Sequence, residues 1–204
     1  MSGLRDFIDA LAGGDISAAA GLVSPNLARE VIEGGASRQA AASNFIAALG
    51  CYAYAGDTAL HFAAAAWRPD LVRALVAAGA DVAAVNRLGA APLHYAAAGN
   101  PDSPRWNPAA QAATIAAIAA AGAGPDARDR NGATALHRAV RTRCAAAVRA
   151  LLEAGADPTL PTKNGSTPAH LATVNSGRGG SGSAAAKTQQ AEIVKLLEGL
   201  GAPL

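Results

Sequence analysis

Four histidines are the residues of this sequence whose type and spacing first suggest chemistry. They are all the histidines of the 204-residue chain and lie 33, 43 and 33 residues apart, at His61, His94, His137 and His170. Imidazole is a common metal ligand and a general base near neutral pH. A regular row of histidines therefore indicates either a metal or catalytic site or a structural position that recurs along the chain.

The residues around the histidines recur with them. Each histidine closes a tetrapeptide: Thr-Ala-Leu-His at 58–61 and 134–137, Ala-Pro-Leu-His at 91–94, and Thr-Pro-Ala-His at 167–170. In the clearest copy, Asn131-Gly132 predicts a turn before a short apolar helix. A second apolar helix follows, and Gly155 ends it. The elements that position each histidine are thus a turn and a pair of short helices.

This unit resembles the ankyrin repeat, whose period is about 33 residues and whose pattern includes this tetrapeptide. The resemblance covers residues 54–204 and is closest to the Ala-rich, bacterial type of that family. It implies an all-α ankyrin-repeat solenoid with short β-hairpin fingers, which we expect at residues 82–90, 125–133 and 158–166. The repeat boundaries that follow from the period are 54–86, 87–129, 130–162 and 163–204.

The resemblance also implies a role for the motif histidines, which is to form hydrogen bonds within and between repeats. Histidines one repeat apart lie about 10 Å from one another, because packed helices are separated by about that distance. That separation is too large for them to share one metal ion. Cys144 follows Arg143, but the chain has no spare histidine to act as its base. We therefore expect no metal, no cofactor and no catalytic residue.

Residues 1–53 precede the repeats and are interpreted as a helical N-terminal cap. Apolar spacing predicts helices over residues 4–12 and 15–23, with Asp15 as the N-cap of the second. Ser24-Pro25 predicts a third helix over 26–33. A fourth is expected over 37–49, where Ala41, Phe45, Ile46 and Leu49 form an apolar stripe.

Composition narrows the class of protein. A net charge of +2 argues against nucleic-acid and membrane-surface partners. Asp6 and Asp9 interrupt the N-terminal apolar pattern, so it does not predict a signal peptide. Cys51 and Cys144 are too few for a disulfide framework, which favours a reducing cytoplasm. Delivery into a host as a secreted effector stays an open alternative.

The function we expect is non-catalytic binding of a partner protein, whose identity is unknown, by a monomer. In the family, the concave surface is formed by the fingers and the exposed faces of the first helices. The residues that match those positions are Phe62, Tyr95, Arg138 and Leu171 on the first helices, and Arg87, Arg128 and Arg130 on the fingers.

An alternative is a small-molecule or anion site, for example for phosphate, under two expanded loops. Repeats 2 and 4 are each longer than the period by about ten residues or more, in the loop between their helices. Arginine and tryptophan, which are typical of binding hot spots, gather at this edge. Besides Trp67, the candidate anion-binding residues are Arg68, Arg105, Trp106, Arg141, Arg143 and Arg178.

Overall fold

The computed structural model describes residues 3–33, 45–174 and 183–200. Within them the chain forms eleven helices and one two-stranded sheet. In chain order the elements are α1 (Gly3–Gly13), α2 (Ile16–Gly21), α3 (Pro25–Arg29), β1 (Phe45–Ile46), β2 (Cys51–Tyr52), α4 (Ala59–Ala65), α5 (Pro69–Ala77), α6 (Pro92–Ala97), α7 (Pro108–Ala120), α8 (Ala135–Arg141), α9 (Ala145–Glu153), α10 (Pro168–Thr173) and α11 (Ala184–Glu198).

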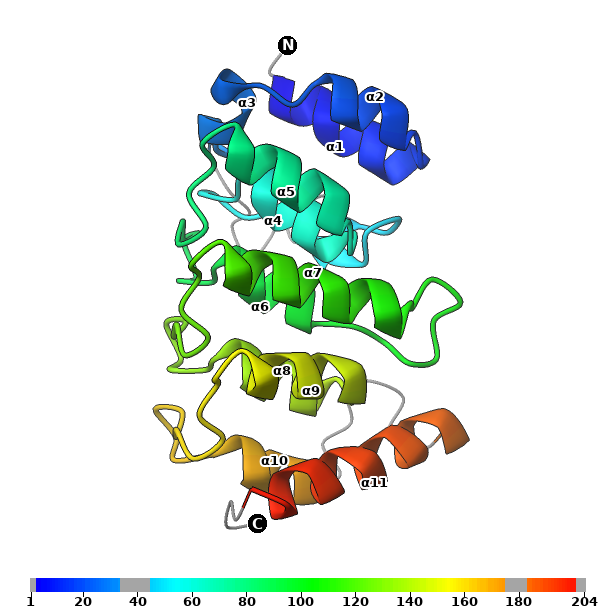
Figure 1. Cartoon of the computed structure of the whole chain (residues 1–204), viewed down its shortest axis with the longest axis vertical. Helices are drawn as coiled ribbons and strands as arrows, with labels where there is room; N and C mark the ends of the chain where they lie inside the picture. The colour runs from blue at the N-terminus through cyan, green and yellow to red at the C-terminus, as the bar shows by residue number, and fades with distance from the viewer. Residues whose placement is uncertain (1–2, 34–44, 175–182, 201–204) are drawn as a thin grey trace.

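The four tetrapeptides each begin a helix pair, and the pairs stack along one axis (Figure 1). The first helices form one layer, in which α4 packs on α6, α6 on α8, and α8 on α10. The second helices, α5, α7, α9 and α11, form the other layer. The stacked pairs therefore form the ankyrin-type solenoid that the sequence predicts.

Alanine makes this stacking close. Ala63, Ala64, Ala96, Ala97 and Ala139 of the first helices are buried without residual exposure. Small side chains let neighbouring helices approach, while Leu and Ile from both layers fill the space between them. Since each contact is small, stability depends on its repetition from pair to pair.

The fingers between the pairs are tight turns stacked on one another. In each finger the hydrogen bonds close a single turn, as in Asn86 N–H to Ala90 O. Successive fingers are joined by one backbone bond each: Arg87 N–H to Ala55 O, Arg130 N–H to Leu88 O, and Lys163 N–H to Asn131 O, at 2.8–3.0 Å. The row of fingers lies along one side of the stack (Figure 1).

The N-terminal segment agrees with the sequence prediction in part. Helices α1, α2 and α3 form where expected, with Asp15 and Ser24 as N-caps. However, α3 ends at Arg29 rather than at 33, because the Glu30 carboxylate turns back and accepts the Leu4 N–H at 2.9 Å. The chain beyond it is extended and pairs with the first finger through Ile32 N–H to Asp57 O.

The helix predicted over 37–49 is wrong for its last part. Phe45 pairs with Tyr52 and Ile46 with Cys51 in an antiparallel hairpin, whose turn includes Gly50 at φ +65°. The Phe45 and Tyr52 rings lie 4.8 Å apart across the two strands, a cross-strand aromatic pair that stabilises a hairpin. Residues 37–44 lie outside the described part of the chain.

Candidate functional site

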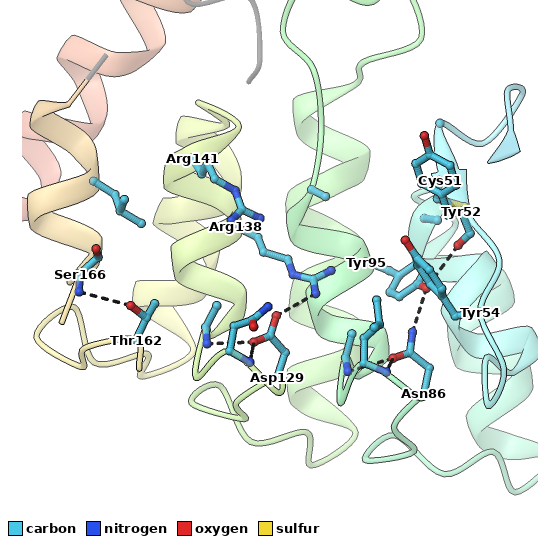
Figure 2. Close-up of a pocket in the computed structure, with 18 of the residues that line it drawn as sticks. Cys51, Tyr52, Tyr54, Asn86, Tyr95, Asp129, Arg138, Arg141, Thr162 and Ser166 are labelled. Carbon is cyan, nitrogen blue, oxygen red and sulfur yellow. Dashed lines mark hydrogen bonds and ion pairs between the residues drawn. The ribbon is translucent and has the colours of Figure 1, made fainter. Parts of the chain in front are cut away.

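A groove of about 590 Å³ runs along the face formed by the first helices and the fingers. The hairpin β1–β2 closes one end, and α10 with the finger before it closes the other (Figure 2). Its lining joins five segments far apart in sequence, and includes Cys51, Tyr52, Tyr54, Asn86, Leu88, Tyr95, Asp129, Asn131, Arg138, Arg141, Thr162, Ser166 and Leu171. The groove therefore exists only in the stacked array.

The hairpin end is aromatic. Tyr52 is 43% exposed and lies between Phe45 and Tyr54, with ring centroids 4.8 Å and 6.2 Å away. The Arg87 guanidinium lies 5.5 Å from the centre of the Tyr54 ring, in cation–π geometry. Leu88, 37% exposed, adds an aliphatic side chain from the next finger. This end presents apolar surface to a ligand.

The floor of the groove is a buried polar network. Asp57 is fully buried and accepts hydrogen bonds from Tyr54 N–H, Asn86 Nδ2 and Tyr95 Oη at 2.7–2.9 Å. Burial raises the pKa of the Asp57 carboxyl, while the nearby His61 and these donors lower it. The network ties two fingers to α6, so it holds the wall of the groove rigid.

The middle of the groove is cationic. Arg138 and Arg141 are one turn apart on α8 and both line the cavity (Figure 2). Arg138 bonds Asp129 at 3.1 Å, and the Asp129 carboxylate also accepts the N–H groups of Asn131 and Ala133. Although burial by itself raises the pKa of Asp129, these bonds hold it below its ordinary value. The arginine therefore fixes the finger to the helix and still borders the groove.

The residues predicted for partner binding are divided by the structure. Tyr95, Arg138 and Leu171 line the groove. Phe62 does not, because its side chain is fully buried in the core between helices. On the fingers, Arg87 is half-buried, while Arg128 and Arg130 are exposed, and Arg128 donates to Pro161 O at 2.7 Å.

Sequence reasoning missed the aromatic end of the groove. Phe45 and Tyr52 were assigned to the N-terminal segment, and Tyr54 to the start of the first repeat, without a functional role. A signal was present: Cys-Tyr-Ala-Tyr at 51–54 follows Gly50 and alternates aromatic with small residues, which is typical of a strand. Tyr54 also occupies the finger position that Arg87, Arg130 and Lys163 hold in later fingers.

The described residues of the alternative anion site do not share one pocket. Arg68 is paired with Asp70, at 2.6 Å and 3.0 Å, and lies with Arg105 beside a small cavity of about 200 Å³. Arg141 lines the large groove instead, and Arg143 is only 3% exposed, too buried to reach a ligand under the loops. Arg178 lies outside the described residues.

Both tryptophans at the edge of the expanded loops are structural. Trp67, 7% exposed, donates to Ala96 O at 3.2 Å, and Gln111 Nε2 bonds the same carbonyl at 3.0 Å. Trp106 is half-buried and donates to Gln111 Oε1 at 2.9 Å. This chain of bonds satisfies the C-terminal carbonyls of α6 beneath the expanded loop. It also offsets the left-handed backbone of Trp67, whose φ is +51°.

The motif histidines occupy the same place in three helix pairs. In each, Nδ1 accepts the N–H three residues earlier and Nε2 bonds the carbonyl of the next finger at 3.0 Å: His61 to Ala90, His94 to Ala133, and His137 to Ser166. Burial lowers the pKa of all three. These bonds leave no lone pair for a metal ion on either nitrogen.

The other reactive groups are held inert. Burial, together with the Asp57 carboxylate, raises the pKa of the Cys51 thiol to about 12, so it is protonated at neutral pH. Burial likewise raises the pKa of Cys144. Among the described residues no cluster of His, Cys, Asp or Glu could hold a metal ion. In the same part of the chain, no helix has the length and hydropathy needed to cross a bilayer.

Comparison with known families agrees with this geometry. The family model described as ankyrin repeats in many copies matches residues 118–172, and the single ankyrin repeat model matches residues 55–87. Comparison with curated proteins gave no significant match. The two matched segments include the α4–α5 pair and the motif of α8–α9. Ankyrin repeats generally mediate protein–protein interaction.

Proposed function

We propose that this ankyrin-repeat protein is a non-catalytic module that binds one partner protein in the groove between its first helices and its fingers. The observation that carries the proposal is the groove itself, a rigid cavity of about 590 Å³ with an aromatic end and a cationic middle. Its residues come from the face that ankyrin repeats use for recognition.

Affinity in such a site comes from preorganisation. The fingers are joined to each other by backbone bonds, and Asp57 and Asp129 tie them to the helices. A partner therefore binds without ordering this surface first, which avoids a cost of about 0.5–1.5 kcal/mol per immobilised side chain. The Cys51 thiol beside the groove is protonated, and the Nδ1 lone pairs of His61 and His94 are engaged by backbone N–H groups, which favours binding over catalysis.

Site-specific photo-crosslinking tests the proposal. A photoreactive amino acid at Leu88, in the groove, should capture a partner in the native cell, whereas the same group at Arg73, exposed on α5, should not. Asn131→Trp, which fills the groove from an exposed finger position, should abolish the capture. Crosslinks from Arg73 alone, or capture unaffected by Asn131→Trp, would move the partner to another face.

We further propose that the protein acts in the cytoplasm as a monomer. Both cysteines are free thiols, as suits a reducing compartment. Cell fractionation tests the location, and light scattering of the purified chain tests its mass. Recovery of the protein outside the cell would instead support the effector alternative.

A further inference from the structure

We propose that the segment which occupies the groove is an extended acidic stretch of the partner, with carboxylates three residues apart and an apolar side chain at the hairpin end. This inference rests on the proposed function and adds the chemistry of the partner. It is carried by three observations: the distribution of charge, the spacing of the fingers and the aromatic end of the groove.

Cations form a row along the fingers. Arg87, Arg130 and Lys163 occupy the same position in three successive fingers, and we call them the finger row. Arg130 and Lys163 are exposed, and within the described part of the chain neither has an ion-pair partner. Arg138 and Arg141 of α8 add charge beside the row. The finger row is not part of the groove lining, but each member directly follows a lining residue, Asn86, Asp129 or Thr162, so the row borders the groove.

Acidic residues are nearly absent from the groove lining. All fifteen Asp and Glu residues of the chain lie in the described ranges, and of these only Asp129 lines the groove. Asp129 is held by Arg138 and by two backbone N–H groups. Asp57 lies beneath the floor and is fully buried. A partner that complements this surface must supply the carboxylates itself.

The repeat sets the spacing of those carboxylates. Stacked helix pairs place equivalent residues about 10 Å apart. An extended polyproline-II segment rises about 3.1 Å per residue with three residues per turn, so every third side chain lies on one face about 9 Å from the last. Carboxylates at every third position therefore match the finger row from Arg87 through Arg130 to Lys163.

The aromatic end gives the segment an anchor. Phe45 and Tyr52 are 44% and 43% exposed, and Leu88 is 37% exposed. Tyr52 lies beside Tyr54, which continues the finger row toward the hairpin, and Phe45 packs against Tyr52. An apolar side chain placed next to the first carboxylate would cover this surface, and burial of apolar area there adds affinity that salt does not screen.

Short fluorescent peptides test the inference by anisotropy with the full chain. One probe carries a Phe followed by three Asp at every third position; a second has the same composition with the Asp residues contiguous; a third has Asn for Asp. At about 0.15 M salt, where exposed charges beyond about 8 Å are screened, the spaced probe should bind at least about tenfold more tightly than the Asn probe. It should also bind more tightly than the contiguous probe.

Matched variants assign the effect to the finger row. Arg130→Gln with Lys163→Gln should remove the advantage of the spaced probe. Arg73→Gln with Lys187→Gln, which removes the same charge from exposed positions on α5 and α11, should leave it intact. Equal loss in both double variants would mean that net charge alone acts, and would overturn the proposal.

Three other outcomes would also overturn it. These are equal binding of the Asn probe, equal binding of the contiguous probe, and tighter binding of a thymidine oligonucleotide than of any peptide. If no peptide binds while Leu88 still crosslinks to an intact partner, this inference is wrong and the proposed function stands. If crosslinking fails as well, the proposed function fails with it.

Discussion

His94 joins two repeats through hydrogen bonds that depend on its ring being neutral. Its Nδ1 accepts Ala91 N–H at 3.1 Å and its Nε2 lies 3.0 Å from Ala133 O. Because Nδ1 faces an N–H donor, the proton must sit on Nε2, and the ring is neutral. Burial, reinforced by the nearby Arg138 charge, lowers the pKa of His94 to about 4. A second proton would break the bond to Ala91.

The first prediction follows from that pKa. An unfolded histidine titrates near 6.5, so between about pH 6.5 and 4 the unfolded state binds a proton that the folded His94 does not. Stability present at pH 7 is therefore lost as the pH falls. His94 alone should remove about 2 kcal/mol of unfolding free energy between pH 7 and 5. Urea unfolding at the two pH values measures the loss.

Two histidine variants identify the source of this loss. In His94→Gln the free energy of unfolding should fall less between pH 7 and pH 5 than in the wild type, whatever the stability of the variant at pH 7. In His170→Gln the free energy of unfolding should fall as much as in the wild type, since His170 is exposed at the end of the stack. An unchanged fall in His94→Gln would assign the acid sensitivity to other groups.

At the scale of elements, the N-cap of α6 differs from those of α8 and α10 because it lacks a hydroxyl group. Thr134 and Thr167 cap α8 and α10 with their hydroxyls, which accept from His137 N–H and His170 N–H, but Ala91 stands at this position before Pro92. Ala91→Thr recreates the Thr-Pro sequence that opens α10. We expect it to raise the free energy of unfolding by about 1 kcal/mol, measured by thermal denaturation. Ala91→Val has the same shape without the hydroxyl, and equal stabilisation by Val would refute the capping explanation.

Two glycines, one in a finger and one after α9, separate two causes of strain. Gly132 and Gly155 both have left-handed backbone, at φ +77° and +89°. A Cβ on Gly132 would meet Lys163 N at 2.9 Å, whereas on Gly155 it would meet nothing within 4 Å. Ala at Gly155 should cost about 1–2 kcal/mol from the backbone alone. Ala at Gly132 should cost clearly more, because it also pushes the next finger away; equal costs in urea unfolding would show that the fingers are not tightly stacked.

The elements that could be predicted from the sequence are those that a local pattern specifies. The helix pairs, the positive-φ glycines and the histidine positions follow from local pattern, since the motif specifies them residue by residue. The hairpin at 45–52 could not be predicted in this way, because the apolar stripe of that Ala-rich segment also fits a helix. Phe62 and Trp67 were misplaced for another reason, because whether their side chains face solvent depends on packing with neighbouring helices. Phe62 is buried in the core, and the Trp67 indole donates to Ala96 O of the next repeat.

At the scale of the whole molecule, the groove is a product of the stack. Its two ends, Tyr52 and Leu171, are far apart in sequence and belong to different segments, joined only through neighbours. In a solenoid each pair contacts only the next, so stability is a sum of local terms and interface terms. Loss of one interface should therefore divide the molecule, and with it the groove.

The last prediction removes one such interface. Thr134→Ala with His137→Ala deletes the cap of α8 and the bond from His137 Nε2 to Ser166 O. The lost cap costs about 1 kcal/mol. The lost side-chain bond costs about 0.5–1.5 kcal/mol more, since Ser166 O keeps its bond from Thr162 N–H. Since the His137 bond joins α8–α9 to the finger before α10, the pair α10–α11 should unfold before the rest of the stack.

Native fluorescence can observe this division, because both tryptophans lie on the N-terminal side of the deleted bond, at Trp67 and Trp106. In the wild type, urea transitions followed by tryptophan fluorescence and by circular dichroism should coincide, as for one cooperative unit. In the double variant the dichroism, which includes α11, should begin to fall at lower urea than the fluorescence does. His170→Ala serves as the control, because its side chain is exposed and no later finger follows it among the described residues. Coincident transitions in the double variant would mean that the repeats are coupled more strongly than one interface, and the motif histidine would then contribute little to the coupling.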